Sequence, residues 1–513
     1  MSKIVLTLCI ASLFPAFAFG EPIGSIPTIK DQDFVVERFV TGIESSPTTM
    51  AFVEDDILVL QKHDGKVRLI RDGKLQDKPV LDVSVTNAGE QGMLGITTVG
   101  STVHLYFTES TSDGEQPIAK RVYKYEWNGS ELVNPVLLKD LPQTRPYHNG
   151  GAMVTGLDDS VYLILGDAGR YGKLQNHKTG EPDNTSVIMR VDKEEPYYAM
   201  GIRNSFGLAV DPVTGNLWDT ENGDDDFDEV NLVLPKFNSG WEVIMGPATQ
   251  DKLSLLPGYE DYVYSDPEFS WQKPIAPTGI TFVNSEPLDK FKNNVFVADC
   301  IYGNLYRFEL NSDRTEFVFK NTELQDKVAS AGDSLDEIVF GSGFGCITDL
   351  EIGPDGLLYI VSLSEGTIFR MIPKSMASGV STEEEGGGCL IATATYGSEL
   401  APQVQFLREI RDNTVLSTAS GTSFMTAFNS FYYSFSPAVA DLERQSPMFK
   451  ETVKIAITPL LSSLSLLQYV DIDSEAEMLG YGIGIILLNL GIYFVMPVSV
   501  ISKLKKKLAK NRI

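Results

Sequence analysis

The chain has 513 residues and a formal net charge of −27, with an isoelectric point of about 4.6. A chain this acidic lacks the basic face that phosphate backbones require, so nucleic acid is excluded as a partner. The acidity is typical of a soluble exterior and does not define a substrate.

The first 20 residues predict a secretory signal peptide. Lys3 supplies the positive start, residues 4–17 form an apolar stretch too short to span a bilayer, and Ala18 and Gly20 are small. We therefore expect cleavage before Glu21. The alternative is a short N-terminal anchor, which the small residues and the proline at position 22 disfavour.

Residues 21–373 predict an all-β domain, a six-bladed β-propeller. One unit recurs: an apolar strand, an Asp/Gly turn, a second apolar strand, a polar turn and a third strand that often ends in Arg. The six copies begin at Met50, Met93, Gly150, Phe206, Pro277 and Ile347. Each copy is a small sheet that cannot bury both faces alone, and six sheets arranged radially cover one another. A β-sandwich is the alternative, and the regular recurrence of one unit argues against it.

The composition changes after the propeller. Residues 374–388 are rich in Ser, Glu and Gly and predict a linker. Residues 389–480 predict a small helical module, because Val404, Leu407 and Ile410 recur every three residues among charged side chains.

Residues 481–502 predict one transmembrane helix. These 22 residues carry no charge, and at about 1.5 Å per residue they would extend about 33 Å. The tail over 503–513 has six basic residues and no acid, so the positive-inside rule places it in the cytoplasm. The expected localisation is the cell membrane, single-pass, with the propeller outside. A buried core helix is the alternative, and it does not explain the basic tail.

Several motifs occur in one order along the propeller: EQGMLGI from Glu90, YHNGG from Tyr147, LGDAGR from Leu165, GIRNSFGLAVDP from Gly201, TENGDDDFDEVNLV from Thr220 and NSGWE from Asn238. Together they resemble the soluble glucose/sorbosone dehydrogenase family, over residues 34–373. The resemblance implies oxidation of aldose sugars with pyrroloquinoline quinone and calcium, and transfer of the electrons to an external acceptor. The run CLIATATYGSELAPQVQFLREIRDN from Cys389 resembles a C-terminal module of exported prokaryotic surface proteins, the CFI-box domain.

Oxidation at an anomeric carbon needs a base for the hydroxyl proton and a cofactor for the hydride, which no side chain accepts. Histidine suits the base because it titrates near neutral pH. Among four histidines, His148 matches the family's catalytic base and Asp167 the carboxylate that orients it. Arg203 matches a quinone contact that would stabilise an oxygen anion. The alternatives are a hydrogen-bonded loop histidine and a structural salt bridge for Arg203.

The resemblance assigns further contacts. Asn204 and Asn222 fall at cofactor-binding positions, and Gln91 falls on the sugar side. Calcium takes about six to eight oxygen ligands, and the family's calcium-binding carbonyls map to Gly223 and Asp224. A solvated acidic loop is the alternative for this segment.

Three positions depart from the family pattern. The cations that hold the carboxylates of the quinone are replaced by Ile301, Cys346 and Thr348, which weakens the expected grip on a tricarboxylate. Cys300 and Cys346 fall near these positions in neighbouring blades, and we expect a disulfide between them, with two unpaired buried thiols as the alternative. A second function therefore stays open: a non-catalytic surface propeller that binds a glycan or a protein.

Overall fold

The computed structural model describes residues 26–141, 145–169, 172–177, 182–193, 197–259, 261–376, 390–396, 401–415, 446–469 and 475–495, and single positions between 418 and 443. The predicted signal peptide, most of the predicted linker and the basic tail lie outside these residues. The chain divides into two compact units, Ile23–Gly379 and a C-terminal unit that begins at Val380.

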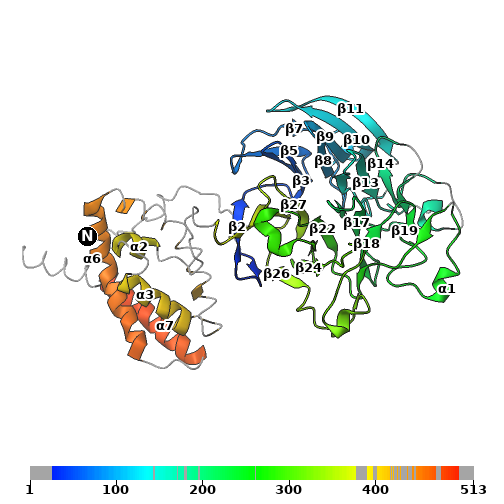
Figure 1. Ribbon diagram of the computed structural model, residues 1–513. Helices are drawn as coiled ribbons and strands as arrows, with labels where there is room; N and C mark the ends of the chain where they lie inside the picture. The colour runs from blue at the N-terminus through cyan, green and yellow to red at the C-terminus, as the bar shows by residue number, and fades with distance from the viewer. Residues whose placement is uncertain are drawn as a thin grey trace, which may run out of the picture. The chain divides into compact units, whose positions relative to one another are not determined.

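The first unit is a β-propeller. Its described strands form six sheets (Figure 1). The innermost strand of each sheet packs against the innermost strand of the next, and the last packs against the first, so the sheets close a ring. These innermost strands are β3 (Pro47–Val53), β8 (Met93–Val99), β12 (Met153–Thr155), β16 (Gly207–Val210), β22 (Pro277–Phe282) and β27 (Ile347–Ile352). The all-β propeller expected from the repeats is confirmed.

The other strands extend each sheet outwards. The β3 sheet adds β4 (Asp56–Gln61), β5 (Lys66–Arg71), β6 (Lys74–Leu75) and β7 (Leu81–Asp82); the β8 sheet adds β9 (Thr102–Ser110), β10 (Pro117–Trp127) and β11 (Leu132–Leu141). The β12 sheet adds β13 (Val161–Leu165), β14 (Val187–Arg190), β15 (Ala199–Met200), β19 (Phe237–Asn238) and β20 (Val263–Tyr264). The β16 sheet adds β17 (Leu217–Glu221), β18 (Asp228–Val233), β21 (Phe269–Trp271) and β25 (Val328–Ala329). The β22 sheet adds β23 (Asn294–Asp299), β24 (Leu305–Glu309), β26 (Val339–Ser342) and β1 (Thr28–Ile29); the β27 sheet adds β28 (Leu358–Ser362), β29 (Thr367–Pro373) and β2 (Phe34–Val40). Short helical turns lie at η1 (Lys173–Gln175), α1 (Gln250–Leu253), η2 (Glu286–Phe291) and η3 (Thr322–Leu324).

The ring is closed by a strand from each end of the propeller. β2 pairs antiparallel with β29, from Phe34 opposite Pro373 to Val40 opposite Ile368. The sheet that contains β27, β28 and β29 therefore takes its fourth strand from the start of the domain. This pairing joins the two ends of the ring, so neither the first nor the last sheet keeps an uncovered face.

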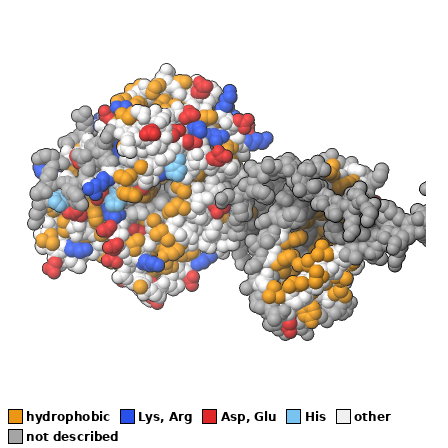
Figure 2. Space-filling model, turned by 180° about the vertical axis from the view of Figure 1, so that it is seen from behind, with side chains coloured by type: hydrophobic (Ala, Val, Ile, Leu, Met, Phe, Trp, Pro, Cys, Tyr) orange, Lys and Arg blue, Asp and Glu red, His pale blue; other side chains and the backbone are white. Residues whose placement is uncertain are grey.

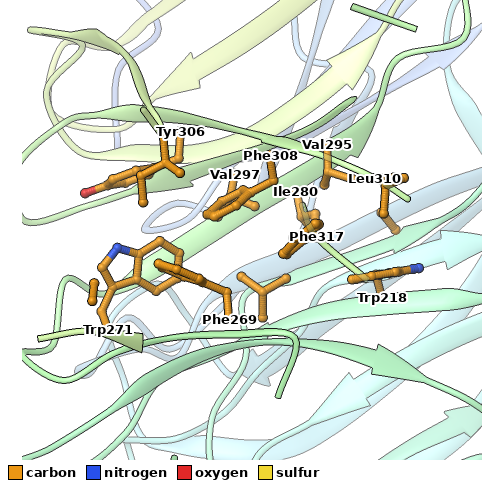
Figure 3. Close-up of a cluster of buried hydrophobic side chains, with 14 of the residues drawn as sticks. Trp218, Phe269, Trp271, Ile280, Val295, Val297, Tyr306, Phe308, Leu310 and Phe317 are labelled. Atoms are coloured by element: carbon orange, nitrogen blue, oxygen red, sulfur yellow. The ribbon is translucent and has the colours of Figure 1, made fainter. Parts of the chain in front are cut away.

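Each gap between neighbouring sheets is filled by one cluster of buried apolar side chains. The cluster between the β16 and β22 sheets is rich in aromatic residues (Figure 3). There Phe308 stacks on Phe317 with ring centroids 4.6 Å apart, and Trp271 meets Phe269 edge to face at 4.9 Å. Offset and edge-to-face contacts of this kind add to the stabilisation from burial. The core is thus a series of layers between sheets, around a central cavity of about 250 Å³ lined by residues of all six innermost strands.

A disulfide joins two neighbouring sheets. Cys300 follows β23 and Cys346 precedes β27, and their sulfurs are bonded. Both residues are half-buried. The disulfide expected from the positions of these cysteines is confirmed.

The C-terminal unit is helical where it is described. It contains α2 (Leu390–Tyr396), α3 (Pro402–Glu409), a π-helical turn (Ile410–Val415), α6 (Pro447–Leu464), a 3-10 turn (Ser465–Tyr469), α7 (Glu475–Leu490) and a second π-helical turn (Gly491–Val495). The small helices expected after the propeller are present. Figure 2 shows hydrophobic side chains on the described surface of this unit. Within α7, Ile483 and Leu487 are 54% and 61% exposed.

The predicted transmembrane helix is not found among the described residues. Among the residues that the structure describes, no helix combines the length and the apolar character needed to cross a bilayer. The predicted span over 481–502 overlaps α7 only from residue 481 to Leu490 and then covers a π-helical turn; its last residues, 496–502, lie outside the described ranges.

Candidate active site

The structure pairs His148 with Asp167. His148 precedes β12 and Asp167 follows β13; these strands are antiparallel neighbours, so both residues lie at the same end of the sheet. His148 Nδ1 lies 2.9 Å from Asp167 Oδ1. The backbone between them is tight, because a Cβ at Gly166 would lie 2.5 Å from the carbonyl oxygen of His148 and 2.7 Å from that of Arg203. The imidazole is 26% exposed and the carboxylate 9%, so the base position faces solvent and its partner does not.

Both oxygens of the Asp167 carboxylate are hydrogen-bonded. Oδ1 also accepts from the backbone N–H of Gly169 at 2.8 Å, and Oδ2 accepts from Trp241 Nε1 at 2.9 Å. Burial acts to raise the pKa of Asp167, but the hydrogen bonds from His148, Gly169 and Trp241 outweigh it and leave the pKa lowered. Asp167 is therefore an ionised group that can hold a proton on His148 Nδ1.

Arg203 lies next to this pair. Its backbone carbonyl accepts from Asp167 N at 2.8 Å, and its guanidinium donates to the carbonyl of Asn222 at 2.9 Å and to Asp224 Oδ1 at 2.8 Å. The guanidinium carbon lies 5.2 Å from the ring centroid of Trp241. Arg203 is 7% exposed, and its buried Nε has no hydrogen-bond partner among the described residues. Arg203 thus connects the loop of Asp167, through its backbone, to the turn of Asn222 and Asp224, through its side chain. It is a cation whose Nε has no hydrogen-bond partner among the described residues.

Asn204 and Gln91 are held within the protein. Asn204 Nδ2 lies 3.3 Å from Glu90 Oε1, and Asn204 Oδ1 accepts from Gly150 N at 3.3 Å. Glu90 also accepts from the backbone N–H of Asn149 at 3.0 Å. Gln91 is 2% exposed. Glu90 thereby connects the loop of His148 and Asn149 to the loop of Arg203 and Asn204. The motif that contains Glu90 was recognised in the sequence, but this role was not predicted.

The predicted calcium segment is an acidic turn whose polar groups are largely hydrogen-bonded. Asn222 Nδ2 donates to the carbonyl of Pro277 at 2.9 Å, and Gly223 N donates to Asp228 Oδ1 at 2.8 Å. Asp228 Oδ2 accepts two further backbone N–H groups, and burial raises its pKa despite them. A Cβ at Gly223 would lie 1.8 Å from the carbonyl oxygen of Phe227. Asp224, in contrast, keeps a carboxylate that is 68% exposed.

Three buried carboxyls lie behind this turn and were not predicted. Glu221 is paired with Glu229, and Asp219 with Asn231, across the antiparallel β17 and β18, so all four side chains share one face of the sheet. Burial raises the pKa of Glu221 to about 7 and raises the pKa values of Asp219 and Glu229 well above their ordinary range. Glu221 accepts from Arg203 N at 2.6 Å and from Ser239 Oγ at 2.5 Å. The hydrogen bond from Arg203 N to Glu221 therefore holds the backbone of Arg203 in place.

The three positions that depart from the family pattern lie at the β22 and β27 sheets. Ile301 is 58% exposed, Cys346 is in the disulfide, and Thr348 Oγ1 donates to the carbonyl of Pro47 at 3.3 Å. Lys273 lies between β21 and β22, and its ammonium is 5.7 Å from the ring centroid of Tyr302.

Comparison with known proteins assigns the propeller to a family. The family model for glucose/sorbosone dehydrogenase matches residues 44–370. The chain belongs to this family. It is similar to the aldose sugar dehydrogenase YliI of Escherichia coli, at 22% identity over 353 residues that cover 64% of this chain and 90% of that protein. It is also similar to quinoprotein glucose dehydrogenase B of Acinetobacter calcoaceticus, at 24% identity over 51% of this chain and 62% of that protein.

Two solved structures share the fold of the propeller. The chain matches a structure described as a putative oxidoreductase (glucose dehydrogenase) from Thermus thermophilus with a TM-score of 0.53 and 24% identity, over 66% of this chain and 100% of that one. It matches the PQQ-bound form of aldose sugar dehydrogenase from Streptomyces coelicolor with a TM-score of 0.50 and 21% identity, over 67% of this chain and 99% of that one. These matches support the fold of the propeller.

Proposed function

We propose that this member of the glucose/sorbosone dehydrogenase family is a sugar dehydrogenase that oxidises the anomeric CH–OH group of an aldose. The observation that carries the proposal is the His148–Asp167 pair, bonded at 2.9 Å, beside the buried guanidinium of Arg203. A partly exposed imidazole backed by a buried carboxylate is the arrangement that a general base requires. The membership of the family supports an oxidoreductase rather than a binding propeller.

The cofactor that the family implies is pyrroloquinoline quinone, and part of this site fits it. Arg203 has a buried donor atom without a partner among the described residues, as expected of a side chain that binds an anionic or carbonyl oxygen. We assign quinone contacts to Arg203, Asn204 and Asn222, of which Arg203 carries the positive charge. When bound, a quinone supplies the hydride acceptor that side chains lack. The positions of Ile301, Cys346 and Thr348 supply no cation, so the grip on the carboxylates is weaker than the family pattern implies.

Calcium fits the turn that follows β17. Hard cations take carbonyl and carboxylate oxygens, and we propose the carbonyls of Gly223 and Asp224 as ligands. The carbonyl oxygens of Asp226 and Phe227 also lie close to Gly223, because a Cβ there would be 2.4 Å and 1.8 Å from them. Among the described residues, no three acidic, histidine or cysteine side chains form a metal cage, so backbone oxygens would provide the site.

The roles of the side chains follow from their contacts. His148 Nδ1 donates to Asp167, so Nε2 is free to take the proton of the sugar hydroxyl. Asp167, ionised, stabilises the imidazolium that results. Arg203 is fixed by Asn222 and Asp224 and offers positive charge where negative charge develops. A bound quinone would pass the electrons to an external acceptor.

A binding and turnover experiment tests the proposal. The purified full chain is dialysed with calcium and quinone, and retention of the quinone and dye reduction with a panel of aldoses are measured. We expect retention at micromolar quinone and activity that His148→Gln abolishes, while His104→Gln, which alters a buried histidine in β9, leaves activity in place. No retention and no dye reduction would refute the dehydrogenase and favour the glycan- or protein-binding propeller.

We also propose that the propeller functions outside the cytoplasm. The disulfide between Cys300 and Cys346 supports this location, since structural disulfides persist in oxidising compartments. The N-terminal residues have the pattern of a cleaved signal. Mass spectrometry of the mature chain tests it: a chain that begins at Glu21 is expected, and a cytoplasmic chain that retains Met1 with both thiols free would refute it.

A further inference from the structure

One aromatic side chain contacts both halves of the candidate site. Trp241 lies in the loop that follows β19, in the NSGWE motif. Its Nε1 donates to Asp167 Oδ2 at 2.9 Å, and its ring lies 5.2 Å from the guanidinium carbon of Arg203. The same indole therefore touches the carboxylate behind the base and the cation beside it.

The loop that carries Trp241 is firmly held. Asn176 and Asn238 exchange two amide hydrogen bonds of 2.8 Å each, and both are nearly fully buried. Asn176 Nδ2 also donates to the carbonyl of Trp241 at 2.9 Å, and Trp241 N donates to the carbonyl of Gly201 at 3.1 Å. These contacts fix the backbone of Trp241 on both sides of its Cα, and the hydrogen bond to Asp167 holds the indole.

The indole N–H decides how the Asp167 carboxylate is oriented. Oδ1 already serves His148 and the N–H of Gly169, and Trp241 supplies the partner of Oδ2. Without that donor, Oδ2 would be a buried acceptor without a partner, and a carboxylate in this state turns towards another donor or takes up water. A turned carboxylate no longer accepts squarely from His148 Nδ1.

We propose that Trp241 is a positioning residue. Its N–H fixes the Asp167 carboxylate so that neutral His148 carries its proton on Nδ1 and keeps Nε2 free. Its ring packs against the Arg203 guanidinium and holds that side chain in place. The consequence for turnover rests on the proposed dehydrogenase function. The consequence for His148 does not, because the tautomer is a property of the chain without cofactor.

The tautomer can be measured directly. The full chain labelled with ¹⁵N-histidine contains four histidines, and His148→Gln identifies the signals of His148. At a pH where the imidazole is neutral, we expect His148 in the wild type to be mainly the Nδ1–H form. In Trp241→Phe, which keeps a ring next to Arg203 and loses the donor, we expect the ratio of Nε2–H to Nδ1–H to rise about tenfold, the equivalent of one hydrogen bond.

Two controls bracket this change. Asp167→Asn reports the ratio for a pair whose carboxylate is lost. Trp271→Phe removes an indole from the buried cluster between the β16 and β22 sheets, where its N–H has no partner among the described residues. We expect Trp271→Phe to lower the melting temperature and to leave the His148 ratio unchanged. A wild-type ratio in Trp241→Phe would overturn the proposal and leave Trp241 as packing.

An isosteric replacement covers the case in which Trp241→Phe does not fold. Incorporation of 3-benzothienylalanine at position 241 keeps the bicyclic shape and replaces the N–H by sulfur, and we expect the same tautomer change. If sugar oxidation is detected, kcat is expected to fall at least tenfold with KM within about twofold. A tautomer change without any oxidation in the wild type would uphold the positioning role and refute the proposed function; oxidation with no tautomer change would do the reverse.

Discussion

The raised pKa of the buried Glu221 carboxyl predicts how the free energy of unfolding depends on pH. Glu221 is fully buried, its ordinary pKa is 4.5, and burial raises that pKa to about 7 in the folded protein. Below pH 4.5 the carboxyl is protonated in both the folded and the unfolded chain, and it favours neither. Between pH 4.5 and 7 the unfolded chain ionises while the folded chain stays protonated, so the free energy of unfolding falls as pH rises. At about 1.4 kcal/mol per pH unit, the loss amounts to about 3 kcal/mol above pH 7.

Glu221→Gln removes the ionisation and keeps the shape. The amide oxygen can accept from Arg203 N, and the amide NH₂ can donate to Ser239 Oγ, whose hydroxyl then donates elsewhere. We expect the variant to be more stable than the wild type by about 2–3 kcal/mol at pH 8, and equally stable at pH 4.5.

Denaturant unfolding monitored by tryptophan fluorescence measures this difference. All four tryptophans of the chain lie in the propeller, so the signal reports that unit alone. Unfolding at pH 4.5, 6 and 8, with calcium held constant, gives the two stability curves. A variant that is less stable than the wild type at pH 8 would refute the reasoning, because it would show that Glu221 is ionised and favourably paired in the folded protein.

Other outcomes follow from the same contacts. His148→Gln is expected to lower kcat by about 10²–10⁴ in the dye assay with the melting temperature unchanged; activity within tenfold of wild type would exclude His148 as the base. Replacement of both Cys300 and Cys346 by Ala is expected to lower the free energy of unfolding by about 4 kcal/mol, because the closed loop spans a separation of 46 residues; an unchanged denaturation midpoint would contradict this. Phe308→Ala in the aromatic cluster is expected to cost about 3–5 kcal/mol by the same fluorescence assay, and a cost below about 1 kcal/mol would show that the cluster collapses around the gap.

The parts of the molecule that local sequence determines were the ones that could be predicted. The propeller followed from a repeated strand–turn unit, because alternating apolar residues and Asp/Gly turns act over a few positions. The positions of His148 and Asp167 were predicted from motifs, and the hairpin of β12 and β13 brings them within 2.9 Å. The disulfide was predicted because Cys300 and Cys346 border strands of neighbouring sheets.

Two contacts between distant motifs were missed. Trp241 meets Asp167 across 74 positions, and Glu90 meets Asn204 across 114. The sequence marks both residues only as members of motifs and carries no sign of which atoms they touch. The membrane helix was predicted from an uncharged stretch and the basic tail that follows it, whereas the described helix α7 ends at Leu490 and is followed by a π-helical turn.

The closure of the ring by β2 has a consequence for how the protein is made. β2 has no partner strand in the chain until β29 has been synthesised, which is the interval from Val40 to Thr367. At about 5–20 residues per second this interval lasts on the order of 15–65 s. Throughout that time β2 is an unpaired strand, and the last three-stranded sheet of another copy can accept it in place of its own. Strand exchange between two nascent chains, with each β2 closing the other's ring, is therefore a misassembly that this topology allows.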